Sequence, residues 1–103
     1  MSLTRAEQAR TSAELKANLR LAEVTAEQVR ADLGFSEDQL DRTLNCDDAQ
    51  PQDVWLLRDH LHNLVLARRV DPVPYSVLTE RARVAAARWF PLRTPPPIDT
   101  TGE

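Results

Sequence analysis

The chain has 103 residues, of which 42% are hydrophobic and 28% are charged, and it contains only two glycines and one cysteine. This length is that of one domain, and the scarcity of glycine together with the many Leu, Ala, Arg and Glu residues favours helix over a turn-rich β fold. The formal net charge of −3 gives no overall positive field that would attract nucleic acid or an anionic membrane, and a single cysteine excludes an internal disulfide.

Three short polar patterns predict where the first three helices begin. Thr4, Thr25 and Ser36 are each followed three residues later by Glu or Gln, which is the capping-box pattern. Gly34 is placed to end the second helix, because glycine accepts the left-handed conformation found there. The predicted helices cover residues 4–21, 25–34 and 36–45. Six apolar residues are expected to form a small core between the second and third helices: Val24, Val29, Leu33, Phe35, Leu40 and Leu44.

A fourth helix is predicted from Pro51 to about Arg69, since proline is tolerated in the first turn. Its main apolar stripe consists of Val54, Leu57, Leu61, Leu64 and Val65, and Trp55, Leu56 and Leu66 broaden it. An apolar surface this wide indicates a helix that is either central to the fold or covered by a partner.

Prolines then divide the rest of the chain. Pro72 and Pro74 break the fourth helix, and a fifth helix is predicted from Ser76 to Trp89. Residues 92–103 include three consecutive prolines and are predicted to be a disordered or extended tail. The sequence therefore predicts an all-α fold, a compact bundle of about five helices in a single domain over residues 1–91.

Residues 24–44 resemble the helix-turn-helix of the lambda-repressor-like superfamily. The matching residues are Thr25, Gln28, Val29, Leu33-Gly34-Phe35-Ser36, Leu40 and Arg42. The resemblance implies a helix-turn-helix core over residues 25–45. Arg30 departs from it, because alanine usually stands where the two helices approach, so a long side chain there must bend out to solvent or open the pair.

Most of the chain is also similar to a small bacterial family known only as a domain of unknown function, number twenty-three sixteen. The similarity is carried by MSLTRAEQ at residues 1–8, VWLLRDHL at 54–61, PYSVLTE at 74–80 and WF at 89–90. It implies an all-helical fold and no particular activity.

The predicted helix pair has the wrong charge for a DNA-binding unit. Residues 25–48 carry two basic and seven acidic side chains, a net charge of −5, whereas non-specific DNA affinity comes from neutralising phosphates. Gln39 and Arg42 are candidates for reading base edges, and Glu37 or Asp38 could accept from cytosine. Base contacts add to phosphate contacts and do not replace them, so duplex DNA is a disfavoured partner.

Residues suited to catalysis do not form a recognisable site. His60 and His62 point to different faces of one helix and cannot share a metal, while Asp59 could make a local hydrogen bond with His62. Cys46 follows a helix end, where nothing lowers the pKa of a thiol, and Asp48 is expected to cap the fourth helix. The sequence predicts no enzymatic activity, no cofactor and no metal.

The favoured interpretation is a non-enzymatic cytoplasmic protein that acts through protein contacts. The chain has no apolar signal region and no membrane-length stretch. Excess apolar surface predicts a homodimer through the fourth and fifth helices, with Trp55, Leu56, Trp89 and Phe90 as interface residues. Burial of this surface within one chain is the competing explanation. The alternative function is a DNA-binding transcription regulator that reads bases through residues 36–45.

Overall fold

The computed structural model describes residues 3–98, and this part of the chain forms five helices and no strand. The helices are α1 (Arg5–Ala22), α2 (Ala26–Leu33), α3 (Glu37–Asn45), α4 (Pro51–Ala67) and α5 (Glu80–Ala87). The predicted all-α fold of five helices is therefore confirmed. No helix within residues 3–98 is long and apolar enough to cross a membrane.

The predicted helix starts are found at the expected residues. The side chains of Thr4 and Ser36 each accept a hydrogen bond from the backbone N–H three residues later. The side chains of Glu7 and Gln39 in turn accept from the backbone N–H of Thr4 and Ser36, which completes both capping boxes. Thr25 caps α2 by accepting from the N–H of Gln28. The side chain of Gln28 donates to Asp32 instead, so this third capping box is only half formed.

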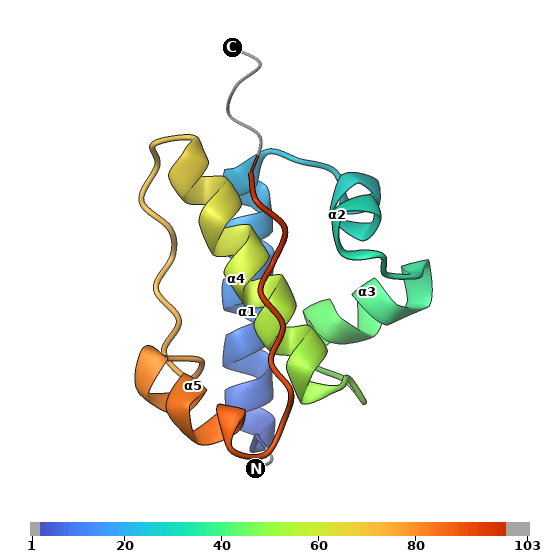
Figure 1. Ribbon diagram of the computed structural model, residues 1–103. Coiled ribbons are helices and arrows are strands. Elements are labelled where there is room, and N and C mark those ends of the chain that lie inside the picture. Colours follow the sequence, from blue (N-terminus) through green and yellow to red (C-terminus); the bar gives the residue numbers. More distant parts are fainter. Residues whose placement is uncertain (1–2, 99–103) are drawn as a thin grey trace.

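The helices α1 and α4 lie against each other through the centre of the molecule, with α2 and α3 on one side of them and α5 on the other (Figure 1). Leu15 on α1 and Leu57 and Leu61 on α4 have no exposed surface. Each such leucine contributes about 1.5–3 kcal/mol when fully buried. The main stripe predicted on α4 therefore supplies the centre of the core, whereas Leu66, which was predicted to broaden that stripe, is half exposed.

The helices α2 and α3 pack on each other around the small core that was predicted between them. Val29, Phe35 and Leu40 are buried, and Val24 and Leu44 pack against them at the edge. Gly34 ends α2 with a φ of +72°, the left-handed conformation that glycine adopts without strain.

The prediction that the fifth helix begins at Ser76 is wrong, because α5 begins at Glu80 with Thr79 as its cap. Tertiary contacts hold the preceding residues in an extended path along α1. Asn18 exchanges two hydrogen bonds with the backbone of Val73, and the N–H and hydroxyl of Ser76 both donate to Glu14. These contacts compete with helix formation, and they let Tyr75 and Leu78 enter the core.

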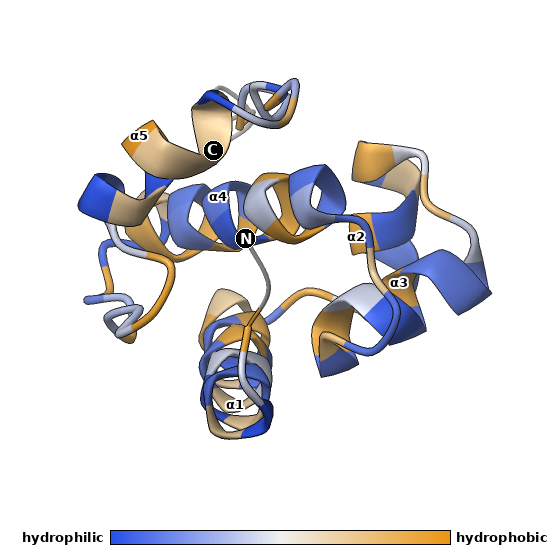
Figure 2. Ribbon diagram, turned by 90° about the horizontal axis from the view of Figure 1, so that it is seen from below, coloured by the Kyte–Doolittle hydropathy of each residue, from blue (hydrophilic) through white to orange (hydrophobic). Residues whose placement is uncertain are grey.

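Residues 91–98 form an extended segment with no regular secondary structure. The segment lies on the side of α4 that faces away from α1 (Figures 1 and 2). Leu92 packs at the edge of the core, and a guanidinium nitrogen of Arg93 is 3.7 Å from a carboxylate oxygen of Asp53. The rest of the predicted tail, residues 99–103, lies outside the described residues.

Candidate functional site

The side chains predicted to read DNA are engaged within the chain. Gln39 completes the cap of α3 and also donates from Nε2 to Asp53 on α4 at 3.0 Å. Arg42 is half exposed, but its guanidinium lies 3.0 Å from Asp38 and 3.9 Å from Asp48. Base reading would require both side chains to exchange these carboxylate partners for an anionic duplex.

The outward surface of α3 is acidic, as its sequence predicts. Glu37, Asp38 and Asp41 are exposed, and Arg42 is the only basic side chain on the helix. Arg30, the departure noted in the helix-turn-helix resemblance, is half-buried, and its Nε is enclosed without a hydrogen-bond partner. Its side chain is therefore not simply turned out to solvent.

The two histidines have different surroundings, and neither pairs with Asp59. His60 is buried, and its Nε2 is 2.9 Å from a carboxylate oxygen of Asp32 on α2, while its Nδ1 is enclosed and has no hydrogen-bond partner among residues 3–98. Burial, and secondarily the Arg58 cation, lower the pKa of His62. The predicted hydrogen bond between Asp59 and His62 is wrong, because arginine side chains occupy the carboxylate of Asp59.

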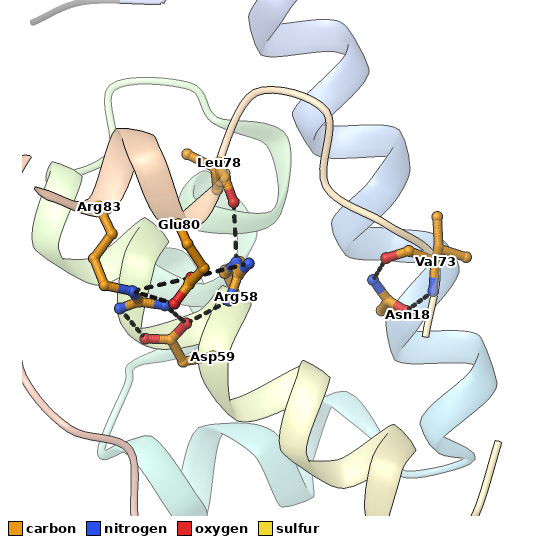
Figure 3. Close-up of polar contacts among 7 residues, drawn as sticks. All are labelled: Asn18, Arg58, Asp59, Val73, Leu78, Glu80 and Arg83. Carbon is orange, nitrogen blue, oxygen red and sulfur yellow. Dashed lines mark hydrogen bonds and ion pairs between the residues drawn. The ribbon is translucent and has the colours of Figure 1, made fainter. Parts of the chain in front are cut away.

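Asp59 is the centre of an ionic cluster that joins α4 to α5 (Figure 3). Arg83 donates from both terminal nitrogens to its carboxylate, and Arg58 donates at 2.9 Å. Arg83 also bonds to Glu80, and its guanidinium lies over the ring of Trp55 at 4.9 Å from the centroid. The hydrogen bonds to Asp59 raise the pKa of Arg83, so this charge persists at any working pH.

The carboxylate of Asp59 is largely engaged within the chain. Both of its oxygens accept hydrogen bonds from arginine, and the side chain is only 12% exposed. The cluster therefore attaches α5 to α4.

The predicted interface residues fall into two groups. Trp55 and Leu56 are 3% and 4% exposed, so they lie in the core of one chain and offer no surface to a partner. This corrects the expectation that they are available to a partner: Arg83 of α5 lies over the ring of Trp55, and both Trp55 and Leu56 belong to the buried core cluster. Trp89 is 75% exposed, and Phe90 packs at the edge of the core.

An apolar pocket of about 230 Å³ opens between the start of α1, the loop joining α3 to α4, and α5. Trp55, Leu78 and Phe90 line it, together with the thiol-bearing residue Cys46. Burial raises the pKa of Cys46 to about 11, so the thiol is not an activated nucleophile. Small-molecule sites usually span about 300–1,000 Å³, and this pocket has room for a single side chain.

Asp48, at the edge of this pocket, does not have the capping role predicted for it. The cap residue of α4 is Gln50, which makes no side-chain bond, and Asp48 is exposed with a φ of +54°. Within residues 3–98, no group of three or more His, Cys, Asp or Glu side chains is placed to hold a metal ion.

A family model described as "Uncharacterized protein conserved in bacteria (DUF2316)" matches residues 1–91. The chain belongs to this family. Comparisons of this chain with curated proteins and with solved structures found no match. Membership of DUF2316 agrees with the family resemblance found in the sequence, and the family description assigns no activity.

Two polar links of this DUF2316 protein were missed by sequence reasoning. The pair of His60 with Asp32 joins residues 28 positions apart, and the pair of Asp59 with Arg83 joins residues 24 apart. No local pattern relates partners at such separations. The available signal was the placement of charged residues, Asp59 and Arg83, within helices that are otherwise rich in apolar residues.

Proposed function

We propose that this protein has no catalytic activity and acts through protein contacts, the first of which is a homodimer formed through α5. The observation that carries the proposal is the exposure of Trp89, which is 75% accessible beside an apolar pocket. Val84 on α5, which ends two residues before Trp89, is 63% exposed. Large apolar side chains left in solvent are enriched at interfaces, and tryptophan is prominent among residues that dominate binding.

The surface around Trp89 is complementary to itself. Phe90, the next residue, lines the apolar pocket, and exposed Arg88 precedes Trp89. Exposed Asp48, in the loop after α3, also lines the pocket, and exposed Asp47 precedes it in that loop. A two-fold axis through this surface would bring Trp89 of each copy to the pocket of the other and Arg88 toward an acidic edge. A closed dimer of this kind uses the same patch twice.

The cytoplasm is the proposed location, since a chain with a single cysteine suits a reducing compartment. The proposal includes no cofactor and no metal. The buried thiol of Cys46 and the arginine-paired carboxylate of Asp59 support a binding role over a catalytic one.

Sedimentation equilibrium at about 10–100 μM tests the dimer. We expect a species of twice the 11.6 kDa monomer mass, and we expect Trp89→Ser to sediment as a monomer. Leu66→Ser is the matched control, because it removes an exposed apolar side chain from the end of α4 and should leave the dimer intact. A wild-type chain that stays at the monomer mass across this range contradicts the proposal.

A second candidate is a DNA-binding regulator with a lambda-repressor-like helix-turn-helix formed by α2 and α3. It is favoured by the packing of α2 on α3 across Gly34 and by the capped start of α3. A titration of duplex DNA at low and moderate salt tests it, because phosphate-driven binding weakens steeply with salt. Sub-micromolar, salt-sensitive binding that is lost in Arg42→Ala would favour this candidate over the dimer.

A further inference from the structure

The extended segment of residues 91–98 occupies a groove on α4 and α2. Its last residues, Pro96, Pro97 and Ile98, line a pocket together with Leu64 of α4. The paired side chains of His60 and Asp32 line the same pocket, which has a volume of about 300 Å³. Near its beginning, the Arg93 guanidinium reaches the Asp53 carboxylate at 3.7 Å. The segment thus meets α4 near its start and again eleven residues later.

The spacing of these two meeting points is that of an extended segment lying along an α-helix. From Asp53 to Leu64, α4 rises about 16 Å at 1.5 Å per residue. From Arg93 to Ile98, a polyproline II segment rises nearly the same distance at 3.1 Å per residue. An α-helical tail over residues 93–98 would rise less than half of this and could not reach both points.

Three of the four half-buried residues of the segment are spaced by three. Leu92, Pro95 and Ile98 are half-buried, as is Pro96, whereas Arg93, Thr94 and Pro97 are exposed. A polyproline II helix has three residues per turn, so every third side chain lies on one face. On α4, Asp53, Leu56, His60 and Leu64 recur at helical spacing and supply the matching stripe.

The family match covers the groove but does not cover the proline segment that lies along it. The family match covers residues 1–91, which include every residue of the groove and end before the proline segment. We propose that the groove is a docking site for an extended proline-rich segment of another protein, and that this chain's own residues 92–98 occupy it as an intramolecular competitor. Proline-rich segments suit such grooves because their extended shape is already formed before binding.

The chemistry on each side specifies the partner further. Asp53 pairs with a basic residue near the start of the segment, and Leu64 lines a pocket with an aliphatic residue five positions later. Prolines between these two anchors keep the segment extended. This site is separate from the α5 surface proposed for the homodimer, and the inference does not rest on that dimer.

Fluorescence anisotropy with a labelled peptide of this chain's residues 91–98, PLRTPPPI, tests the groove. The protein is the full chain with its own tail released by Leu92→Asp and Ile98→Asp. We expect this variant to bind the peptide saturably and at least about tenfold more tightly than the wild type. The wild-type tail competes at an effective concentration of about millimolar, because it is tethered to the groove.

Two controls identify the groove as the binding site. Leu64→Asp added to the released variant should abolish binding, and so should a peptide carrying Arg93→Glu and Ile98→Asp. If the variant with both Leu92→Asp and Ile98→Asp loses helicity, Ile98→Asp alone can be used to release the tail. Ile98 lies at the far end of the segment and outside the buried core, so this change should not unfold the protein. Repeating the titration with Trp89→Ser separates failure of the groove from failure of the dimer.

Three outcomes would overturn the proposal. The first is no saturable binding to a released variant whose helicity equals that of the wild type. The second is equal affinity for the wild type and the released variant, because the tail would then not compete. The third is a wild-type dimer that disappears in Ile98→Asp, because the tail would then be exchanged between copies of this chain and no foreign partner would be needed.

Discussion

Arg83 on α5 donates two hydrogen bonds to the carboxylate of Asp59 on α4, and this bidentate pair joins the two helices. The helix α5 buries only one of its residues, Ala86, so apolar packing contributes little to holding it. Its attachment depends instead on the ionic cluster and on the stacking of Arg83 over Trp55. The covering of Trp55, and hence the shape of the neighbouring pocket, therefore depends on a charged contact.

Replacing Arg83 with alanine should lower the free energy of unfolding by about 1–2 kcal/mol, because a largely buried carboxylate loses its bidentate partner while Arg58 remains. Urea denaturation followed by circular dichroism measures this change. Arg81→Ala is the matched control on the exposed side of α5, and it should stay within about 0.5 kcal/mol of the wild type. Equal losses in the two variants would show that the pair contributes nothing specific.

Asn18→Ala should cost about 2–3 kcal/mol, since it leaves the backbone N–H and carbonyl of Val73 without the partners they have in the folded chain. Thermal and urea unfolding give the value. Asn63→Ala provides the comparison, because Asn63 is half-buried and has no side-chain hydrogen bond within residues 3–98. If both variants unfold alike, the connection to α5 does not depend on Asn18.

Gly34→Ala tests how α2 ends. A Cβ at this position would meet nothing within 4 Å, so the expected loss of about 1 kcal/mol comes only from the positive φ of 72°. Gly34→Asn should lose less, because asparagine tolerates this conformation better. If urea denaturation shows a loss of unfolding free energy several times larger than this, a steric clash at residue 34 would have to contribute to it.

Cys46 should react slowly with iodoacetamide in the folded chain. Its thiol is buried and its pKa is raised to about 11, so roughly one part in a thousand is thiolate at pH 8. Mass spectrometry after timed labelling should show alkylation only when urea unfolds the protein. Rapid labelling of the native chain would indicate that the pocket beside Cys46 opens readily.

The pKa of His62 makes stability depend on pH. Burial, followed by the Arg58 cation, lowers this pKa below its ordinary value of 6.5 in the folded chain. As the pH falls through 6.5 the unfolded chain takes up the proton first, so the free energy of unfolding should decrease from that pH downward and stop decreasing below the folded pKa.

Urea denaturation between pH 5 and 8 measures this dependence in the wild type and in His62→Gln. The variant should lose less stability than the wild type over the acidic part of this range, because it lacks the group that protonates on unfolding. Parallel curves for the two proteins would assign the pH dependence to other groups.

The ends of the first three helices were determined by the sequence alone. Thr4, Thr25 and Ser36 each cap a helix through a contact only three residues away, and Gly34 ends α2 through its own backbone freedom. Such contacts involve only residues close in the sequence, so they do not depend on the path of the rest of the chain. The same is true of the apolar stripe on α4, which follows from helical spacing.

Only the tertiary structure decided where α5 begins and what covers Trp55, because both depend on residues distant in the sequence. The helix α5 begins at Glu80 because contacts with Asn18 and Glu14, more than 50 residues earlier, hold residues 73–76 in an extended path. Burial of Trp55 depends likewise on where α5 lies, and sequence spacing could not separate a face covered by the same chain from one covered by a partner. The physical reason is that periodicity shows which faces of a helix are apolar, whereas only the path of the chain determines what covers each face.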